Sequence, residues 1–256
     1  MLAVSCWKAL ADELDAWRQA GRCAELWLRD DDAGRAEAPL VQLVELCGEY
    51  QIPANFAAIP TNSVTETAAL FDNLDNAFVL VHGYAHTDHA GTGERKTEFS
   101  SDRATTDVEK EWGEGLRLIE EIYGPKALRV FVPPWNRMAY ELKTQLAGAG
   151  FTGYSGLGAR TSEIEHKLTI ANVHVDMIDS RRRAFRGSEL TLASVVRHLQ
   201  DKRAGRADPT EPTGVMTHHL VFDEESWLFL RRLFATTSRQ DGVCWRSGGD
   251  IFGLSG

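Results

Sequence analysis

Short apolar runs alternate with segments of helical period from residue 25 almost to the end of the chain. The runs are short and mostly apolar, as expected for strands buried on both faces. Seven of them are strand candidates: Glu25–Arg29, Ala54–Ile59, Ala77–Val81, Leu128–Val132, Phe151–Ser155, Asn172–Ile178 and Gly214–His218. This alternation is typical of βα units arranged around a parallel sheet.

Four of the intervening segments keep their apolar residues on one helical face. Their ends carry residues that commonly start or stop helices. The predicted boundaries are Pro39 and Gly48 for the first helix, Gly124 for the end of the second, Ser188 as the N-cap of the third and Asp223 for the entry to the last. Residues 91–101 and 201–212 are predicted to be polar loops.

The chain shows no linker rich in Pro, Gly or Ser and no internal repeat, so we expect one domain over residues 1–256, with residues 1–24 as an N-terminal helical extension. Seven βα units over this length are compatible with a closed (β/α) barrel or with an open doubly wound sheet. In both architectures the reactive residues belong at the carboxyl ends of the strands.

Charge and hydropathy narrow the range of partners. The 256 residues carry a net charge of -9, which argues against nucleic acid as a partner because phosphate binding needs a basic face. A neutral or cationic ligand is easier to accommodate. No segment approaches the roughly 20 apolar residues of a membrane span, and no secretory signal is evident. We therefore expect a cytoplasmic protein without a membrane partner, whose oligomeric state the sequence does not reveal.

The four cysteines suggest no sulfur chemistry. Cys6, Cys23, Cys47 and Cys244 form neither a Cys-x-x-Cys pair nor a pattern of close spacings. We expect no thiolate zinc site and no disulfide framework, and reduced thiols in a cytosol are the simplest interpretation.

Polar clusters begin where five of the apolar runs stop. They are Asp30–Asp32, His82–His86, Pro133–Arg137, Asp176–Asp179 and His218–His219. Two imidazoles four residues apart can converge on one metal ion, and a carboxylate can join them. Two neutral His nitrogens and one carboxylate leave a position open on a tetrahedral ion, which is typical of a catalytic zinc site.

These five clusters, in this order, resemble the polysaccharide deacetylase family, the metal-dependent carbohydrate esterases related to chitooligosaccharide and peptidoglycan deacetylases. The resemblance covers residues 25–235. It implies an α/β fold, a single-domain seven-stranded (β/α) barrel that is often distorted or incompletely closed. It also implies a hydrolase that removes an acetyl or other acyl group from an N-acetylated sugar or related amide.

The first acidic cluster is similar to the family's first motif, an apolar residue followed by Asp-Asp-Gly. Here Asp30 stands in the apolar position and Ala33 in the glycine position. The resemblance implies that Asp31 is the general base and Asp32 a metal ligand, although a register one residue earlier stays open. Strand alternation separates Asp31 from Asp32, so both reach one site only if the chain bends there.

The histidine cluster is similar to the second motif, His-Ser/Thr-x-x-His, with Gly83 in the hydroxyl position. The resemblance implies that His82 and His86 are metal ligands, because residues i and i+4 share a face of a helical turn. His89, three residues further on, is expected to be an ordinary loop residue.

The segment Phe131–Asn136 resembles the third motif, Arg-x-Pro-aromatic, with Val132 where the family has Arg. In the family that arginine pairs with the base, so Arg137, Arg29 or one of Arg181–Arg183 is expected to replace it. The backbone N–H of Trp135 is the implied oxyanion donor. The residues implied at the oxyanion and substrate side of the site are Pro134, Trp135, Asn136, Arg137 and Asp176.

The last two clusters match less closely. Asp176–Ser180 resembles the fourth motif, Asp-x-x-Asp-Trp, with Ser180 in place of tryptophan. Val215–His219 resembles the final motif, an apolar run ending in histidine, and implies that His218 is the general acid. His219 stays open as the alternative, because strand register decides which ring faces the site.

The implied cofactor is a divalent metal ion, with Zn2+ the first choice and Mn, Co, Ni or Fe as alternatives. The implied partner is a small saccharide or acylated amine substrate. Two other functions stay open. One is a non-catalytic carbohydrate- or metal-binding protein on the same scaffold, suggested by the missing arginine and the altered fourth motif. The other is a metal-independent glycosidase with two carboxylates.

Overall fold

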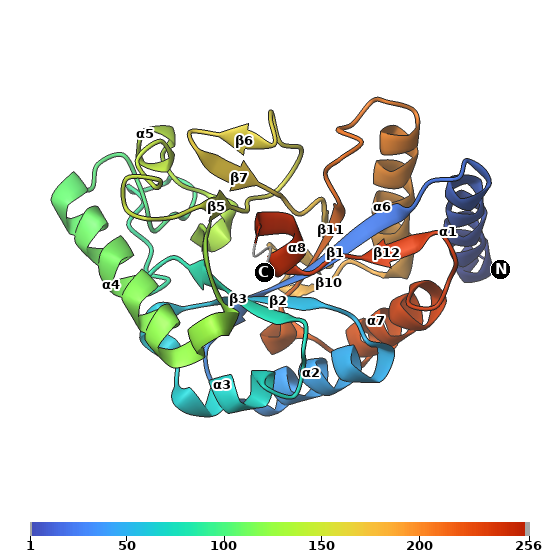
Figure 1. Ribbon diagram of the computed structural model, residues 1–256, viewed down its shortest axis with the longest axis horizontal. Helices are drawn as coiled ribbons and strands as arrows, with labels where there is room; N and C mark the ends of the chain where they lie inside the picture. Colours follow the sequence, from blue (N-terminus) through green and yellow to red (C-terminus); the bar gives the residue numbers. More distant parts are fainter. Residues whose placement is uncertain (1, 254–256) are drawn as a thin grey trace.

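A curled, mostly parallel sheet forms the centre of the computed structural model, which describes residues 2–253 (Figure 1). Its parallel strands, in order of pairing, are β7 (Leu168–Ile170), β5 (Gly153–Tyr154), β4 (Ala127–Val132), β3 (Ala77–His82), β2 (Ala54–Ala58), β1 (Ala24–Ala33), β11 (Thr213–Thr217) and β8 (Val175–Asp176). The remaining strands are β6 (Ile164–Glu165), antiparallel to β7, β12 (Val243–Trp245), parallel to the start of β1, and the hairpin of β9 (Ile178–Asp179) and β10 (Ala184–Phe185).

The sheet curls into a distorted and incompletely closed (β/α) barrel, as predicted, although it has eight parallel strands in series where seven were expected. Its two ends are bridged by one extended stretch, residues 168–176, which pairs with β5 through β7 and with β11 through β8. The predicted strand Asn172–Ile178 is therefore divided between β8 and β9. The strands that the sequence did not predict, among them β6 and β12, span two or three residues, too few for an alternation of side chains to be recognised.

Helices surround the sheet (Figure 1). The helices are α1 (Leu2–Gln19), α2 (Ala38–Tyr50), α3 (Thr65–Phe71), α4 (Thr105–Tyr123), α5 (Tyr140–Lys143), α6 (Ser188–Arg203), α7 (Glu224–Thr237) and α8 (Gly248–Phe252), with 3-10 turns η1 (Pro60–Asn62), η2 (Gly124–Lys126), η3 (Pro134–Asn136) and η4 (His219–Val221). Within residues 2–253, none of these helices is long and apolar enough to cross a membrane.

Two predicted helix boundaries are wrong by a few residues. Gly48 lies inside α2, which continues to Tyr50 and ends on Gln51 in the left-handed conformation. Ser188 is the first residue of α6, and Gly187 occupies the N-cap position. Asp223, in contrast, caps α7 as predicted, because its carboxylate accepts the backbone N–H of Ser226 at 2.8 Å.

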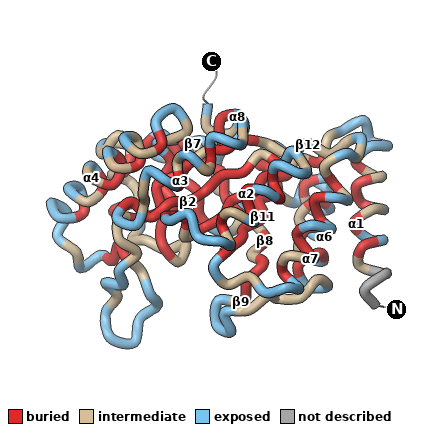
Figure 2. Tube along the Cα trace, turned by 90° about the horizontal axis from the view of Figure 1, so that it is seen from below, coloured by how far each residue is buried: buried red, intermediate tan, exposed pale blue. Residues whose placement is uncertain are grey.

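Apolar side chains form two layers, one on each face of the sheet. The larger layer lies between the sheet and the helices. The smaller one fills the barrel and includes Trp27, Val130, Val173 and Met216. Phe252 of α8 packs edge-on against Trp27 and closes the amino-terminal end of the barrel. Figure 2 shows α8 and the β9 turn at opposite ends, so the other end is the one left for polar side chains.

One disulfide corrects the expectation of reduced thiols. Cys23, just before β1, is bonded to Cys244 of β12, which pairs with β1 over Ala24–Leu26. The two cysteines are 221 residues apart, and such a spacing does not indicate a bond. Cys47 is a buried free thiol in α2. Because disulfides persist in oxidising compartments, the bond also removes an argument for a cytosolic location.

Candidate metal centre and active-site cleft

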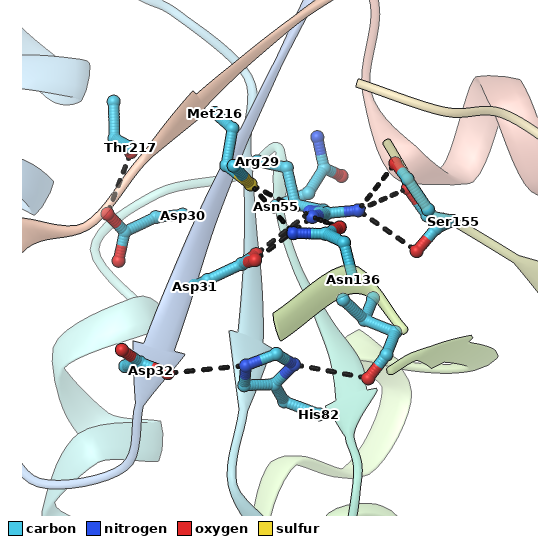
Figure 3. Close-up of polar contacts among 12 residues, drawn as sticks. Arg29, Asp30, Asp31, Asp32, Asn55, His82, Asn136, Ser155, Met216 and Thr217 are labelled. Atoms are coloured by element: carbon cyan, nitrogen blue, oxygen red, sulfur yellow. Dashed lines mark hydrogen bonds and ion pairs between the residues drawn. The ribbon is translucent and has the colours of Figure 1, made fainter. Parts of the chain in front are cut away.

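The end of β1 sends its three aspartates in different directions (Figure 3). Trp27, Arg29 and Asp31 alternate into the barrel, whereas Asp30 faces the opposite side. Asp32 breaks this alternation, because its φ is 71° and the pairing of β1 with β2 shifts register between Asp30 and Ala33. The expected bend is therefore present, and it brings Asp32 to the same side as Asp31.

Asp32 meets the two histidines of the second cluster. Its Oδ1 atom lies 3.2 Å from His82 Nε2 and 3.3 Å from His86 Nε2. The three donor atoms lie within 4.8 Å of one another, the only such group among the described residues. The structure thus brings together the three predicted ligands in the expected register. His89 is exposed and takes no part in the group.

The donor set has the chemistry of a divalent cation site. His82 Nδ1 lies 3.1 Å from the carbonyl oxygen of Val132, so a proton on Nδ1 leaves the Nε2 lone pair facing Asp32. Asp32 Oδ1 is buried and has no hydrogen-bond partner among the described residues. A buried carboxylate oxygen without a donor is costly unless a cation balances it. The residues present therefore fit a metal ion bound by one carboxylate and two imidazoles.

The charges of this group are strongly coupled. Burial raises the pKa of Asp32, but His82, His218 and His86 outweigh burial and hold that pKa well below its usual range. Burial and the neighbouring His82 lower the pKa of His86. Burial also lowers the pKa of His82, yet the two aspartates Asp32 and Asp31 outweigh it, and the net shift is upward. A proton and a metal ion would therefore compete for His82 Nε2.

A buried glutamate supports the turn between the two histidines. Glu98, which is 1% exposed, accepts backbone N–H groups from Tyr84 at 3.1 Å and Ala85 at 2.8 Å. Gly83 makes this contact possible: its φ is 61°, and a Cβ there would lie 2.0 Å from a Glu98 oxygen. Sequence analysis missed Glu98, because a single acid in a polar loop carries no distinguishing pattern. Glycine in the motif's hydroxyl position is thus explained by the carboxylate beside it.

Arg29 supplies the cation that the third motif lacks (Figure 3). Its guanidinium holds both oxygens of Asp31, with Nε–Oδ1 at 2.8 Å and Nη2–Oδ2 at 2.9 Å. It also donates to Asn136 Oδ1 at 2.6 Å and to the backbone and hydroxyl oxygens of Ser155. The Arg29 side chain is 0% exposed and the Asp31 side chain 1% exposed. Of the five candidate arginines, Arg29 is the one paired with Asp31, whereas Arg137 donates to the carbonyl oxygen of Lys96.

The third cluster forms η3 beside His86. Trp135 and Asn136 both have a φ of 54°, which turns the Trp135 ring onto His86 at 4.3 Å between centroids. Pro134 is buried against Gly83. Trp135 and Asn136 therefore lie between the metal-site histidines and the Arg29–Asp31 pair.

The two histidines at the end of β11 have different surroundings. His219 is 2% exposed, and its Nδ1 and backbone N–H both contact the Asp30 carboxylate, which also accepts the Thr217 hydroxyl at 2.7 Å. Burial opposes this pairing, but Asp30 raises the pKa of His219. His218 is only partly buried and its Nδ1 has no partner among the described side chains. The ring left available for chemistry is that of His218.

Asp176 lies on β8 next to β11, opposite Met216 in the pairing. Burial raises the pKa of its carboxyl group, while the charge of His218 lowers it. Asp179, the other acid of this cluster, caps the β9–β10 turn through the backbone N–H of Arg181 at 2.9 Å. The two acids of the fourth cluster therefore have separate surroundings.

A cleft of about 900 Å³ joins these groups at the carboxyl ends of the strands. Of the predicted site residues, those that line it are Asp31, Asp32, His82, His86, Trp135, Asn136, Arg137, Asp176 and His218. The predicted residue outside this lining is Pro134.

Solved structures share this architecture. A Mycobacterium smegmatis protein assigned as a polysaccharide deacetylase superposes with a TM-score of 0.63 and 16% identity over 90% of this chain and 89% of that one. The chain has the polysaccharide deacetylase fold. A family 4 acetyl xylan esterase from Clostridium thermocellum, in complex with a cobalt ion, gives 0.58 and 13% over 90% and 91%. A family 4 carbohydrate esterase from Streptomyces lividans, in complex with acetate, gives 0.54 and 14% over 87% and 92%.

No protein-family model and no curated protein matches the sequence. The deacetylase fold is thus recognised at identities where pairwise alignment carries little signal. The five polar clusters could still be matched to the family's motifs, because each stands at the end of a strand and they follow one another in the same order along the chain.

Proposed function

We propose that this chain is a metal-dependent hydrolase that removes an acetyl or similar acyl group from an N-acylated saccharide or a related amide. The observation that carries the proposal is the convergence of Asp32, His82 and His86 in a cleft that Asp31 and His218 also line. The deacetylase fold, with neighbours that hold cobalt and acetate, supports it.

Asp32, His82 and His86 would hold the ion. A divalent cation there supplies a Lewis acid that polarises the scissile carbonyl and acidifies water, and zinc, manganese, cobalt, nickel and iron all suit the donor set. Asp31 takes the proton of the attacking water. Each carboxylate oxygen has two lone pairs, so the contacts with Arg29 leave Asp31 able to accept it.

The remaining steps fall to Trp135 and His218, which also line the cleft. The backbone N–H of Trp135 donates to the oxygen that becomes negative in the tetrahedral intermediate, a contribution of about 3 kcal/mol where such donors have been removed. His218, protonated, delivers its proton to the leaving nitrogen, because an amine leaves poorly until it is protonated. The products are a carboxylic acid and a free amine.

Arg29 also bears on the non-catalytic alternative. That alternative was motivated partly by the loss of the motif arginine, and a buried guanidinium from β1 now occupies the corresponding chemical position beside Asp31. No contact among the described residues favours a glycosidase.

The test combines metal analysis with two variants. We expect Asp31→Asn to retain the metal and to lose at least about 100-fold in turnover of an N-acetylated saccharide, because the base is gone. We expect His82→Ala to lose the metal itself. Metal content by mass spectrometry and acetate release, with and without a chelator, measure both. Full activity of Asp31→Asn, or activity that survives the chelator, contradicts the proposal.

A further inference from the structure

Four basic side chains line the cleft outside the groups assigned to chemistry. They are Arg35 after β1, Lys96 in the loop that follows β3, Arg137 after η3, and Arg183 in the β9–β10 turn. They come from four separate segments, and all four segments lie at the end of the barrel where the cleft opens. The positive charge at this end of the barrel therefore comes from the folding of four segments together and not from one basic stretch of sequence.

None of these four cations forms an ion pair within 4.0 Å among the described residues, although the pKa of the exposed Asp88 is lowered by the backbone N–H groups of Ala90 and Thr97 and then by the nearby Lys96. Other basic side chains do have such a partner, as in Arg103–Glu111 at 2.6 Å and Arg203–Glu13 at 2.9 Å. In the cleft, Arg137 donates only to a backbone carbonyl, and Lys96 Nζ lies 5.8 Å from the centre of the Trp135 ring. Burial, and then the neighbouring Arg95, lower the pKa of Arg137, so like charges crowd there. Arg137 is partly buried, whereas Arg35, Lys96 and Arg183 are exposed residues of the lining.

The acids of the cleft are already balanced. Asp31 is neutralised by Arg29, and Asp32 belongs to the candidate metal group. Burial raises the pKa of Asp176 and so disfavours its charged form. Glu37 is the remaining acid of the lining, against four basic side chains. The cleft as a whole therefore carries excess positive charge, the opposite of what the whole-chain charge suggested for the ligand.

We propose that the substrate carries an anionic group, a carboxylate or a phosphate, which Arg137, Arg183, Lys96 and Arg35 bind while the acyl group lies at the metal centre. This inference rests on the proposed function for the identity of the reacting group. The excess positive charge of the cleft follows from its lining residues and does not depend on the proposed function. Guanidinium groups suit both anions, because their paired N–H donors match two oxygens at once.

The experiment compares three sugars that share one acetamido group: N-acetylglucosamine, which is neutral, N-acetylglucosamine 1-phosphate and N-acetylmuramic acid, which carries a carboxylate. Binding to the full-length, metal-loaded Asp31→Asn protein is measured by calorimetry at two salt concentrations, and acetate release is measured with the wild type. We expect at least one anionic sugar to bind about 10-fold more tightly than the neutral one, with the advantage reduced at high salt.

Matched variants locate the effect. Arg183→Gln is compared with Arg182→Gln, because Arg182 is the preceding residue and is exposed like Arg183, but lies outside the lining and faces Asp179 at 3.8 Å. We expect only Arg183→Gln to weaken the anionic sugar, by about 5-fold, and to leave the neutral one unchanged.

Equal binding of all three sugars, or equal losses in the two variants, overturns the inference and leaves the proposed function intact. Tight, Arg183-dependent binding of an anionic sugar with no acetate released from any of the three overturns the function instead. Preference for the phosphate or for the carboxylate sugar identifies which anion the cleft binds.

Discussion

Replacing Arg29 tests whether the buried guanidinium holds the catalytic end of β1 together. In Arg29→Met the Asp31 carboxylate, which is 1% exposed, loses both of its charged hydrogen bonds, and the Ser155 carbonyl oxygen loses its donor. Removing one partner of a buried ion pair costs about 3–5 kcal/mol. For a domain of this size that loss lowers the melting temperature by roughly 6–20 °C.

The assay is urea unfolding followed by circular dichroism, with Arg117→Met as a matched control. Arg117 pairs with Glu121 on the exposed face of α4, so its loss is expected to leave the free energy of unfolding nearly unchanged. The double variant Arg29→Met/Asp31→Asn should recover part of the stability, because the unpaired charge is gone while the Ser155 carbonyl oxygen stays without its donor.

Two results would refute this reasoning. One is a free energy of unfolding for Arg29→Met within about 1 kcal/mol of the wild type, since a buried charge left unpaired should destabilise the protein by more than that. The other is a double variant no more stable than Arg29→Met, which would mean that the cost does not come from Asp31.

Two further changes probe the turn at the metal centre and the pH dependence of stability. Gly83→Ala forces a Cβ to 2.0 Å from Glu98 and should weaken zinc binding about 10- to 100-fold in a competition titration. Gly113→Ala is the control, because a Cβ at that position meets nothing within 4 Å. Equal zinc affinities of the two variants would contradict this prediction. Burial, then His174 and Lys202, lower the pKa of His198 to about 3, so its contribution to stability is present above the unfolded pKa of about 6.5 and is lost as pH falls from there toward 3. Urea unfolding between pH 7 and 4 should show a slope from this group of at most about 1.4 kcal/mol per pH unit. That slope should be missing in His198→Gln and kept in His89→Gln, and an unchanged slope in His198→Gln would exclude this origin.

The parts of the site that the sequence predicted are those fixed by strand ends. His82 is the last residue of β3 and Asp32 lies one residue before the end of β1, so the apolar run before each residue indicates the end of the barrel at which it lies. The choice of Asp32 over Asp31 as the residue facing the histidines could not be derived from alternation. It depends on the backbone conformation of Asp32, whose φ is 71°, and a run of aspartates does not predict that conformation.

The supporting contacts were harder to predict because they join residues that are far apart in the chain. Arg29 reaches Asn136 and Ser155 across the barrel, over separations of 107 and 126 residues. Glu98 contacts a turn 13 residues earlier from within a loop that looked merely polar. Several residues of the same charge could have made each contact, and only the three-dimensional arrangement shows which one does. Arg29, and not Arg137, is the arginine beside Asp31.

The bond between Cys23 and Cys244 makes most of this chain a covalent ring, with α1 attached outside it as a tail. A ring cannot expand as far as a linear polymer, so the oxidised protein should expose less surface on unfolding and show a smaller denaturant m-value than the reduced one. In the chain-entropy account, a loop of this length is worth about 5 kcal/mol. Unfolding experiments with and without a thiol reductant would therefore refer to two different denatured ensembles, and their free energies should not be pooled.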